Sequence, residues 1–490
     1  MNDTDGARAA QRAREPAYLG ISQIGELLAD RRVSSVELCQ SLLARYERLE
    51  PQLNAFISLS PERILSDARA AETELARGTV RGPLHGVPIA VKDSCWTKGE
   101  RTTAGAMVMS DFVPDRDATV VARLRAAGAI IFGKTNLPEF AYGPVNSYHF
   151  GPTRNPWDLE RFAGGSSMGS GAAVAAGVVP GAIGSDTTGS IRNPSTWAGV
   201  VGLKPTYGLV PLRGVTPLAT SLDHVGPIAR SAQDCALLLE AIAGYDRLDP
   251  TSVDRGVGRY VAGLERSVRS VRLGILRDLW SPLPDDLSRV LDNGLRVLGS
   301  LGVRSMDATV AAWDAAAEAS HVLVRCEAAA QYRDLLKERG ADFLPQVRER
   351  LEAGLATPAP DYLDAQRVGR RLRLELRELF KQVDVLALPA RERTAPLMDA
   401  AGHRHDPEAG PRYAAPVNIA GLPALTIPCG FDDNGLPVGL QLVGRAWEEG
   451  TLLALAHQFQ QITEWHRRHP PLPQPRTPLP ISTTAAVQTT

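Results

Sequence analysis

Ala163-Gly-Gly-Ser-Ser-Met-Gly-Ser-Gly171 and Gly184-Ser-Asp-Thr-Thr-Gly-Ser190 are two runs rich in glycine and in small hydroxyl side chains. Glycine lets peptide N–H groups approach a ligand closely. Upstream, the mostly apolar run Gly86-Val-Pro-Ile-Ala-Val-Lys92 ends in a lysine. A lysine that is buried there loses its proton readily and can act as a base. Together with the hydroxyls of Ser166 and Ser190, it predicts acyl transfer by a serine nucleophile without histidine.

Composition narrows the class of protein. The chain has 490 residues, of which 44% are apolar and 22% charged, as is usual for a soluble globular protein. Its net charge is -1, from 54 basic and 55 acidic residues, which argues against a nucleic-acid or membrane-surface partner. The five cysteines show no paired spacing, so we expect neither disulfides nor a zinc site. The first residues lack an apolar signal region, and no apolar stretch reaches the ~20 residues that span a bilayer, so we predict a cytoplasmic protein.

Helical and strand patterns alternate along the chain, which favours an α/β fold in a single large domain. We expect a flexible arm over residues 1–18, the domain over 19–470 and a flexible tail over 471–490. Inside the domain, the two glycine-rich runs belong to a core at about 82–230, and a variable, mostly helical region follows at about 231–380.

Individual elements follow from local patterns. Ser34 and Glu37 form a capping-box pattern before a helix at 36–46. A second helix is predicted at 118–127, with Asp117 as its N-cap and Gly128 as its stop. A third, of small residues able to lie close against a sheet, is predicted at 168–178. Strands are predicted at 129–132, 181–185, 200–203, 383–388 and 439–443.

Two familiar motifs match the sequence, but the residues around them do not have the secondary structure that each motif requires. Gly128-Ala-Ile-Ile-Phe-Gly-Lys-Thr135 matches the phosphate-binding P-loop, yet its middle residues are themselves an apolar strand, which leaves no loop for phosphate. Gly165-Ser-Ser-Met-Gly169 matches the nucleophile elbow of α/β-hydrolases, with Ser167 as the nucleophile. An elbow must follow a buried strand, whereas the residues before this one are polar and contain proline. An esterase that uses Ser167 therefore remains only an alternative.

A larger set of motifs, in order and over most of the chain, resembles the amidase signature hydrolases. The motifs are Gly86–Asp93, Gly133–Asn136, Gly151–Pro156, Gly164–Ser170, Asp186–Arg192, Gly199–Pro205, Ser221–Pro227 and Gly421–Pro428. The resemblance implies a mixed β-sheet core surrounded by helices. It also implies hydrolysis of a carboxamide with no metal and no organic cofactor.

The resemblance also assigns site residues. Lys92 matches the family's catalytic lysine, Ser166 the serine that follows a cis peptide bond, and Ser190 the nucleophile. The backbone N–H groups of Thr187, Thr188, Gly189 and Ser190 match the oxyanion hole. These roles are physically reasonable, because a serine hydroxyl needs a base, and a tetrahedral oxyanion needs preorganised donors.

Other residues have weaker assignments. Tyr142, Met107 and Gly165 are candidates for the substrate pocket, although ordinary packing explains the first two equally well. Asp186 and Arg192 are expected to have a structural role as a salt bridge or turn.

The chain departs from the family pattern at two places. Met168 stands where glycine is usual, and Thr188 stands where a second glycine is common, inside the expected oxyanion loop. An added side chain there could narrow or polarise the acyl pocket, so acyl preference is the property we expect to differ.

The sequence predicts an amidase that acts on a small-molecule amide or anilide, with ester or carbamate substrates also open. The main alternative is the A-type subunit of a glutamine-dependent amidotransferase. Residues 347–354 are unlike the glutamine-recognising stretch of such subunits, which favours a free-standing amidase. A non-catalytic binding protein on the same fold is a further alternative, and a homodimer is left open.

Overall fold

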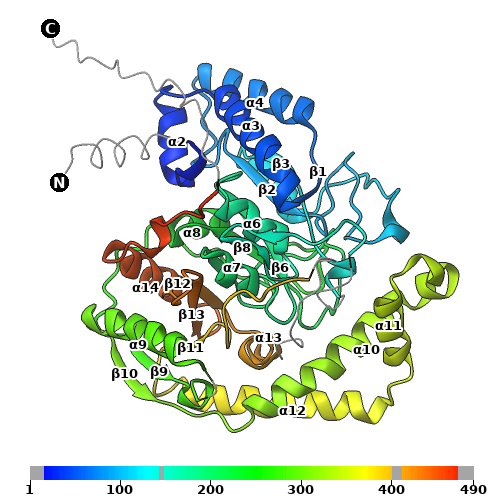
Figure 1. The fold of residues 1–490 in the computed structure, drawn as a ribbon, viewed down its shortest axis with the longest axis vertical. Helices are drawn as coiled ribbons and strands as arrows, with labels where there is room; N and C mark the ends of the chain where they lie inside the picture. The colour runs from blue at the N-terminus through cyan, green and yellow to red at the C-terminus, as the bar shows by residue number, and fades with distance from the viewer. Residues whose placement is uncertain (1–15, 143–147, 282, 400–410, 473–490) are drawn as a thin grey trace.

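A mixed β-sheet of eleven strands runs through the part of the molecule that the structure describes (Figure 1). The structure is a computed structural model that describes residues 16–142, 148–281, 283–399 and 411–472. The strands lie in the order β1-β3-β2-β6-β8-β7-β12-β13-β11-β9-β10. Their bounds are β1 Phe56–Ser58, β2 Pro88–Lys92, β3 Ile130–Thr135, β6 Gly181–Asp186, β7 Val201–Lys204, β8 His224–Ala229, β9 Arg272–Ile275, β10 Arg304–Asp307, β11 Val385–Pro389, β12 Ala424–Phe431 and β13 Pro437–Gly444.

The sheet is parallel at two places and antiparallel between them. β2 pairs in parallel with both β3 and β6, and β9 pairs in parallel with β10 and β11. All residues of β2, β3, β8, β11 and β13 are buried, as expected where helices cover both faces of a sheet. A separate two-stranded ribbon, β4 Arg154–Asn155 with β5 Asp158–Phe162, precedes the first glycine-rich run.

Helices pack on the sheet and extend beyond it. α5, α8, α14 and α9 contact one another in succession along it, and α6 contacts α7. Figure 1 shows α10, α11 and α12 reaching away from the sheet as a helical arm. The helices are α2 Ile21–Ala29, α3 Ser35–Leu53, α4 Pro61–Ala76, α5 Thr119–Ala126, α6 Met168–Ala175, α7 Arg192–Ala198, α8 Ala232–Ile242, α9 Asp285–Ser300, α10 Trp313–Arg339, α11 Pro345–Leu355, α12 Ala359–Leu379, α13 Ala415–Ala420 and α14 Glu449–Gln461.

The predicted fold class, a mixed sheet surrounded by helices in one large domain, is confirmed. The capping box before α3 is also present: the Glu37 N–H donates to Ser34 Oγ at 3.1 Å, and the Ser34 N–H donates to the Glu37 carboxylate at 2.9 Å. The predicted strands and the small-residue helix at 168–178 correspond to elements whose ends differ by a few residues.

One local prediction was wrong. Asp117 does not cap α5, whose N-cap is Ala118, because its carboxylate instead accepts from the Lys98 N–H at 2.7 Å. The region 231–380, predicted to be mostly helical, contains α8 to α12 and also contributes β9 and β10 to the edge of the sheet. Of the arm predicted over 1–18, residues 1–15 lie outside the described residues, while Pro16–Tyr18 form a 3-10 turn in which Pro16 and Ala17 are buried.

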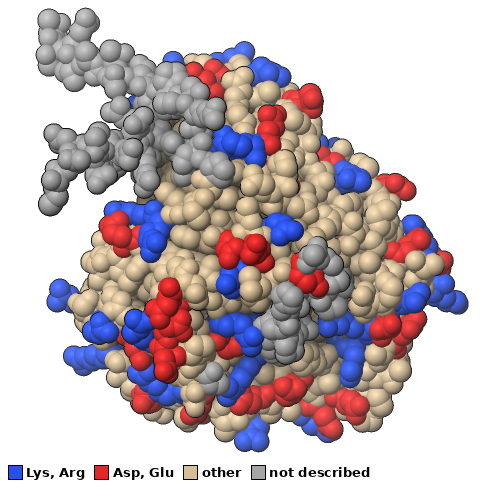
Figure 2. All heavy atoms as spheres, viewed as in Figure 1, with Lys and Arg blue, Asp and Glu red and all other residues tan. Residues whose placement is uncertain are grey.

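The described residues contain no helix that is both long and apolar enough to cross a membrane. On the face seen in Figure 2, acidic and basic side chains are interspersed rather than gathered by sign. This distribution matches the near-zero net charge and gives that face no extended field of one sign.

Gly169 shows why α6 needs a glycine near its start. A Cβ at this position would lie 2.1 Å from the Ala55 carbonyl oxygen and 2.4 Å from the Asn136 nitrogen. The backbone of α6 therefore touches the segments that flank β1 and β3. This close approach holds the start of α6, and the serines before it, against the sheet.

We expect Gly169→Ala to destabilise the protein by about 1–3 kcal/mol, because the added methyl group meets backbone atoms that cannot move aside. The midpoint of thermal or urea unfolding measures the effect. Gly299→Ala is the matched control, since Gly299 lies in α9 with nothing within 4 Å of an added Cβ. The control should leave the midpoint unchanged or raise it slightly. Equal midpoints for the two variants would contradict the packing argument.

Candidate active site

Lys92 is the last residue of β2 and is fully buried. Its Nζ donates to Ser166 Oγ at 2.8 Å and to Ser185 Oγ at 2.9 Å. Ser185 lies near the end of β6, which pairs with β2 in parallel, so the two side chains meet at the same edge of the sheet. The lysine therefore has two hydroxyl partners and no carboxylate in direct contact among the residues that the structure describes.

The environment of Lys92 favours the neutral amine. Burial lowers its pKa from the usual 10.5 to about 7, and the more distant negative groups, Asp186 and Asp223 among them, only partly oppose this shift. A lysine in this state holds and releases a proton near neutral pH, which suits a general base.

Ser166 and Ser190 come from adjacent loops. The Gly165–Ser166 peptide bond is cis, at the place where the resemblance implies one, and Ser166 is buried beside Lys92. Ser190 lies in the loop between β6 and α7, and the Ser167 N–H donates to its carbonyl at 3.1 Å. Its side chain is half-buried, and among the hydrogen bonds of the described residues none involves Ser190 Oγ. The structure thus brings Lys92 and Ser166 into contact and leaves the Ser190 hydroxyl available.

The loop 187–191 is held at one end by Asp186, which is completely buried. Its carboxylate accepts from the Gly189 N–H at 2.7 Å and the Ile191 N–H at 3.1 Å, and forms an ion pair with Arg192 at 3.0 Å. Asn418 of α13 adds a further donor at 2.8 Å. Burial alone would raise the pKa of Asp186, but Arg192 and these donors hold it well below its usual range. Asp186 and Arg192 therefore have the structural role that the sequence favours.

This geometry changes the set of free donors in the loop. The Gly189 N–H is already bonded to Asp186, so it is not free to stabilise an oxyanion. The N–H groups of Thr187, Thr188 and Ser190 make no hydrogen bond within the described part of the chain. Three of the four predicted donors thus remain available.

Ser167 occupies a different environment from its neighbour. Its hydroxyl is fully buried, donates to the Ser185 carbonyl at 3.1 Å and accepts from the Ser185 N–H at 3.2 Å. The strand before it, β5, belongs to the small ribbon rather than to the central sheet. Its φ of -85° is also outside the left-handed region. Ser167 therefore fastens the loop to β6, and the geometry disfavours the alternative that makes it a nucleophile.

Sequence and fold are both similar to known amidases. Residues 37–453 match the Amidase family. The chain is 43% identical over 481 residues to the A-type subunit of the glutamyl-tRNA(Gln) amidotransferase of Azotobacter vinelandii, and the match covers 92% of this chain and 99% of that protein. The chain belongs to the amidase signature family.

Solved structures place it in the same family. One is described as a vestigial protein complex that reveals the origins of an s-triazine catabolic enzyme, with a TM-score of 0.85, 35% identity, and coverage of 90% of this chain and 98% of that one. Another is the peptide amidase of Stenotrophomonas maltophilia, with a TM-score of 0.80, 33% identity, and coverage of 92% and 98%. The protein is thus an amidase-signature hydrolase that acts on C–N bonds.

The three candidate pocket residues differ in burial. Tyr142 is buried, and its carbonyl accepts from Arg350 of α11 at 3.2 Å. Met107 begins a 3-10 turn and is 45% exposed, while Gly165 is half-buried directly before the cis bond. Met168, at the first turn of α6, is fully buried. Contact of Tyr142, Met107 and Gly165 with substrate stays a prediction.

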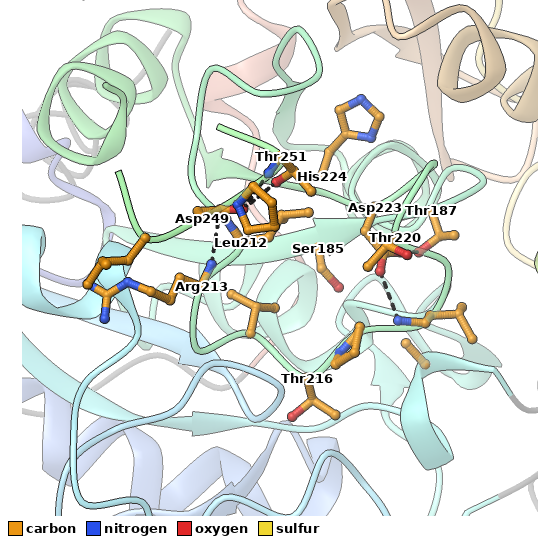
Figure 3. A pocket seen from close by; sticks show the side chains of 16 residues that line it. Ser185, Thr187, Leu212, Arg213, Thr216, Thr220, Asp223, His224, Asp249 and Thr251 are labelled. Atoms are coloured by element: carbon orange, nitrogen blue, oxygen red, sulfur yellow. Dashed lines mark hydrogen bonds between the residues drawn. The ribbon is translucent and has the colours of Figure 1, made fainter. Parts of the chain in front are cut away.

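A cavity of about 230 Å³ adjoins the buried end of this site (Figure 3). Ser185, Thr187 and Asp223 line one side of it, and the loop residues Leu212 and Asp249 line another. In Figure 3 the imidazole of His224 points away from the space between them. Neither Lys92 nor Ser190 is among the lining residues, so the cavity meets the site at Ser185 and Thr187.

Three residues that support the site had no role assigned from the sequence. They are Ser185, the second partner of Lys92; Asp223, which accepts from Thr187 Oγ1 at 2.6 Å; and Asn418, which bonds Asp186. Asp223 lies inside the Ser221–Pro227 motif that carried the resemblance, and Ser185 lies inside the glycine-rich run Gly184–Ser190, so their position was the only available signal. Over the described ranges, no group of three or more His, Cys, Asp or Glu side chains could hold a metal ion.

We expect amide hydrolysis to increase as the pH rises through about 7 and then to level off, because only the neutral form of Lys92 is a base and its pKa is about 7. Steady-state kcat/KM between pH 5 and 9 measures this. Lys92→Ala should lower the rate at pH 7 by about 10²–10⁴-fold and recover partly at alkaline pH, where hydroxide replaces the base. A rate–pH profile that is identical in the variant would exclude Lys92 as the base.

Proposed function

We propose that this protein hydrolyses a carboxamide through an acyl-enzyme formed on Ser190. The observation that carries the proposal is the contact between Lys92 Nζ and Ser166 Oγ, 2.8 Å long and fully buried. Ser166 is followed by Ser167, whose N–H donates to the Ser190 carbonyl at 3.1 Å, so the loops that carry the two serines are in contact. A neutral Lys92 can therefore take the proton of Ser166 while Ser166 takes that of Ser190.

The proposed reaction has an acylation step and a deacylation step. The Ser190 alkoxide attacks the carbonyl carbon, and the resulting oxyanion is stabilised by the N–H groups of Thr187, Thr188 and Ser190. The C–N bond breaks as the amine or ammonia leaves with a proton from Ser166, which regains one from Lys92. Water then attacks the acyl-enzyme by the same relay and releases the carboxylate. Esters, anilides and carbamates present the same carbonyl and leaving heteroatom, so they are additional candidate substrates.

The comparisons favour the amidotransferase role over the free-standing one. Bacterial A-type subunits are 40–43% identical to this chain and match along almost the whole of both sequences. On that basis, glutamine is a candidate amide donor and further subunits are candidate partners. The free-standing alternative is supported by the structural similarity to the peptide amidase and by residues 347–354, which lie in α11. Both roles share the amide-cleaving step at Ser190. A homodimer and a cytoplasmic location stay predictions.

We expect Ser190→Ala to abolish turnover of every substrate in a panel of amides, anilides, esters and carbamates. Ser167→Ala, which removes the rival hydroxyl, should keep turnover. Release of ammonia, amine or alcohol is followed for both variants and the wild type. An activity-based serine probe should label the wild type and Ser167→Ala but not Ser190→Ala. Turnover that persists in Ser190→Ala would contradict the assignment, and a wild type that neither turns over substrate nor reacts with the probe would support a non-catalytic binding protein.

The two roles make opposite predictions for glutamine. An A-type subunit should release ammonia from glutamine, and its glutaminase rate should rise when the other subunits of the source organism are added or co-purified. A free-standing amidase should instead prefer small uncharged amides and be indifferent to added subunits. Ammonia release from glutamine and from a matched neutral amide, each with and without the other subunits, discriminates between the two roles.

A further inference from the structure

We infer that Asp223 is a positioning residue, which fixes the oxyanion loop of the proposed reaction by holding the hydroxyl of Thr187. The inference rests on the proposed function, because it concerns the donors that would stabilise the oxyanion formed after attack by Ser190. Neither composition nor motif spacing assigns a role to this carboxylate. It does not contact Lys92, Ser166 or Ser190 by any hydrogen bond of the described residues.

The Asp223 carboxylate accepts hydrogen bonds from residues in two loops. Its Oδ1 accepts from Thr187 Oγ1 at 2.6 Å, and its Oδ2 accepts from the N–H groups of Leu218 and Ala219 at 2.8 and 3.1 Å. Asp223 is 8% exposed and Thr187 is 3% exposed, so water competes little for these bonds. A hydrogen bond to a carboxylate is roughly twice as strong as one between neutral groups. Thr187 is therefore firmly held through its side chain while its N–H stays free.

The loop that carries Asp223 is itself fixed from outside by the helical arm. Tyr332 of α10 donates its hydroxyl to the Pro217 carbonyl. Glu327, one turn earlier on α10, accepts from both the N–H and the hydroxyl of Ser221, at 3.0 and 2.5 Å. The loop that carries Asp223 is thus fixed to α10 on both sides of this buried carboxylate's other partners, Leu218 and Ala219.

Asp223 and Asp186 together hold both ends of the loop 187–191. Asp186 bonds the N–H groups of Gly189 and Ile191, and Asp223 bonds the side chain of Thr187. Thr188, the residue between these anchors, is bulkier than the glycine that is common in the family. The two carboxylates therefore restrain the loop that carries the free N–H groups, and an oxyanion hole requires donors that are preorganised in this way.

Asp223 also acts on Lys92 through its charge. It is one of the negative groups that raise the pKa of the lysine against the dominant effect of burial. Other charged or titratable groups near Asp223 are Glu327 and Tyr332 of α10 and Tyr207, which follows β7. Burial raises the pKa of Asp223 itself to about 6, so the carboxylate is charged at neutral pH. A neutral residue at 223 should therefore lower the pKa of Lys92.

Thr187→Val removes the anchoring hydroxyl but keeps both the size of the side chain and the backbone N–H. We expect kcat to fall about 10- to 100-fold while KM changes by less than about threefold, since the loss is confined to the transition state. Thr187→Ser, which restores the hydroxyl, should recover most of the lost rate. The matched control is Thr79→Val, the same chemical change at an exposed position outside the cavity, where only the backbone N–H makes a hydrogen bond among the described residues. The control should leave kcat and KM unchanged.

Asp223→Asn tests the partner. It should lower kcat to a similar extent and also move the rate–pH midpoint to lower pH, because one negative charge near Lys92 is lost. Thr187→Val should leave that midpoint in place. The double variant should lose no more rate than the more impaired single variant, because both changes remove one interaction. Rates are normalised to active enzyme by burst titration with an activated ester, so that a partly unfolded preparation does not imitate a slow one.

Several results would overturn the inference. These are a wild-type kcat in Thr187→Val, equal losses in Thr187→Ser and Thr187→Val, or losses that multiply in the double variant. If Ser190→Ala also retains turnover, the proposed function fails. If Ser190→Ala is inactive while Thr187→Val is intact, only the role of Asp223 fails.

Discussion

The burial of Lys92 without a carboxylate in direct contact is the constraint on which the rest of the site depends. An ammonium group that leaves water for a protein interior loses solvation, which is costly unless an opposite charge replaces it. Here two serine hydroxyls stand where an opposite charge would be needed. Loss of the proton therefore removes the free-energy penalty of desolvating the ammonium group. In the proposed mechanism, the same Ser166 hydroxyl that accepts from the lysine also passes the proton on. The proposed base and relay are therefore one physical arrangement.

A second buried lysine, Lys134, has a different kind of partner from Lys92. Lys134, on the neighbouring strand β3, is as buried as Lys92, but its Nζ lies 3.0 Å from Asp93 and also donates to the Cys95 carbonyl at 2.9 Å. It belongs to the run that matches the P-loop by letter. Two buried lysines on neighbouring strands thus differ in their partners, because Lys134 meets a carboxylate whereas Lys92 meets two hydroxyls.

The sequence named candidate residues for the chemistry more readily than the contacts that support them. Lys92, Ser166 and Ser190 could be named because their runs are unusual and resemble a family. Gly189 was assigned a free N–H that is in fact bonded to Asp186, since a motif gives the order of residues but not the direction of a peptide. Ser185 and Asp223 had no role because their partners, Lys92 and Thr187, are distant in sequence and meet only through sheet pairing and loop packing. The strands β8, β12 and β10 were not predicted either. β8 and β12 contain Pro227 and Pro428, and proline is atypical of a central strand, whereas β10 is short, polar and exposed.

The helical arm contacts both the supports of the proposed reaction site and a candidate residue of the substrate pocket. α10 fixes the loop of Asp223 through Tyr332 and Glu327, and α11 reaches Tyr142 through Arg350. In the proposed function, a change in these helices is therefore expected to alter the supports of the oxyanion loop as well as the surroundings of Tyr142. The contacts of α10 and α11 thus give the helical arm a direct physical connection to both the proposed reaction site and a candidate pocket residue.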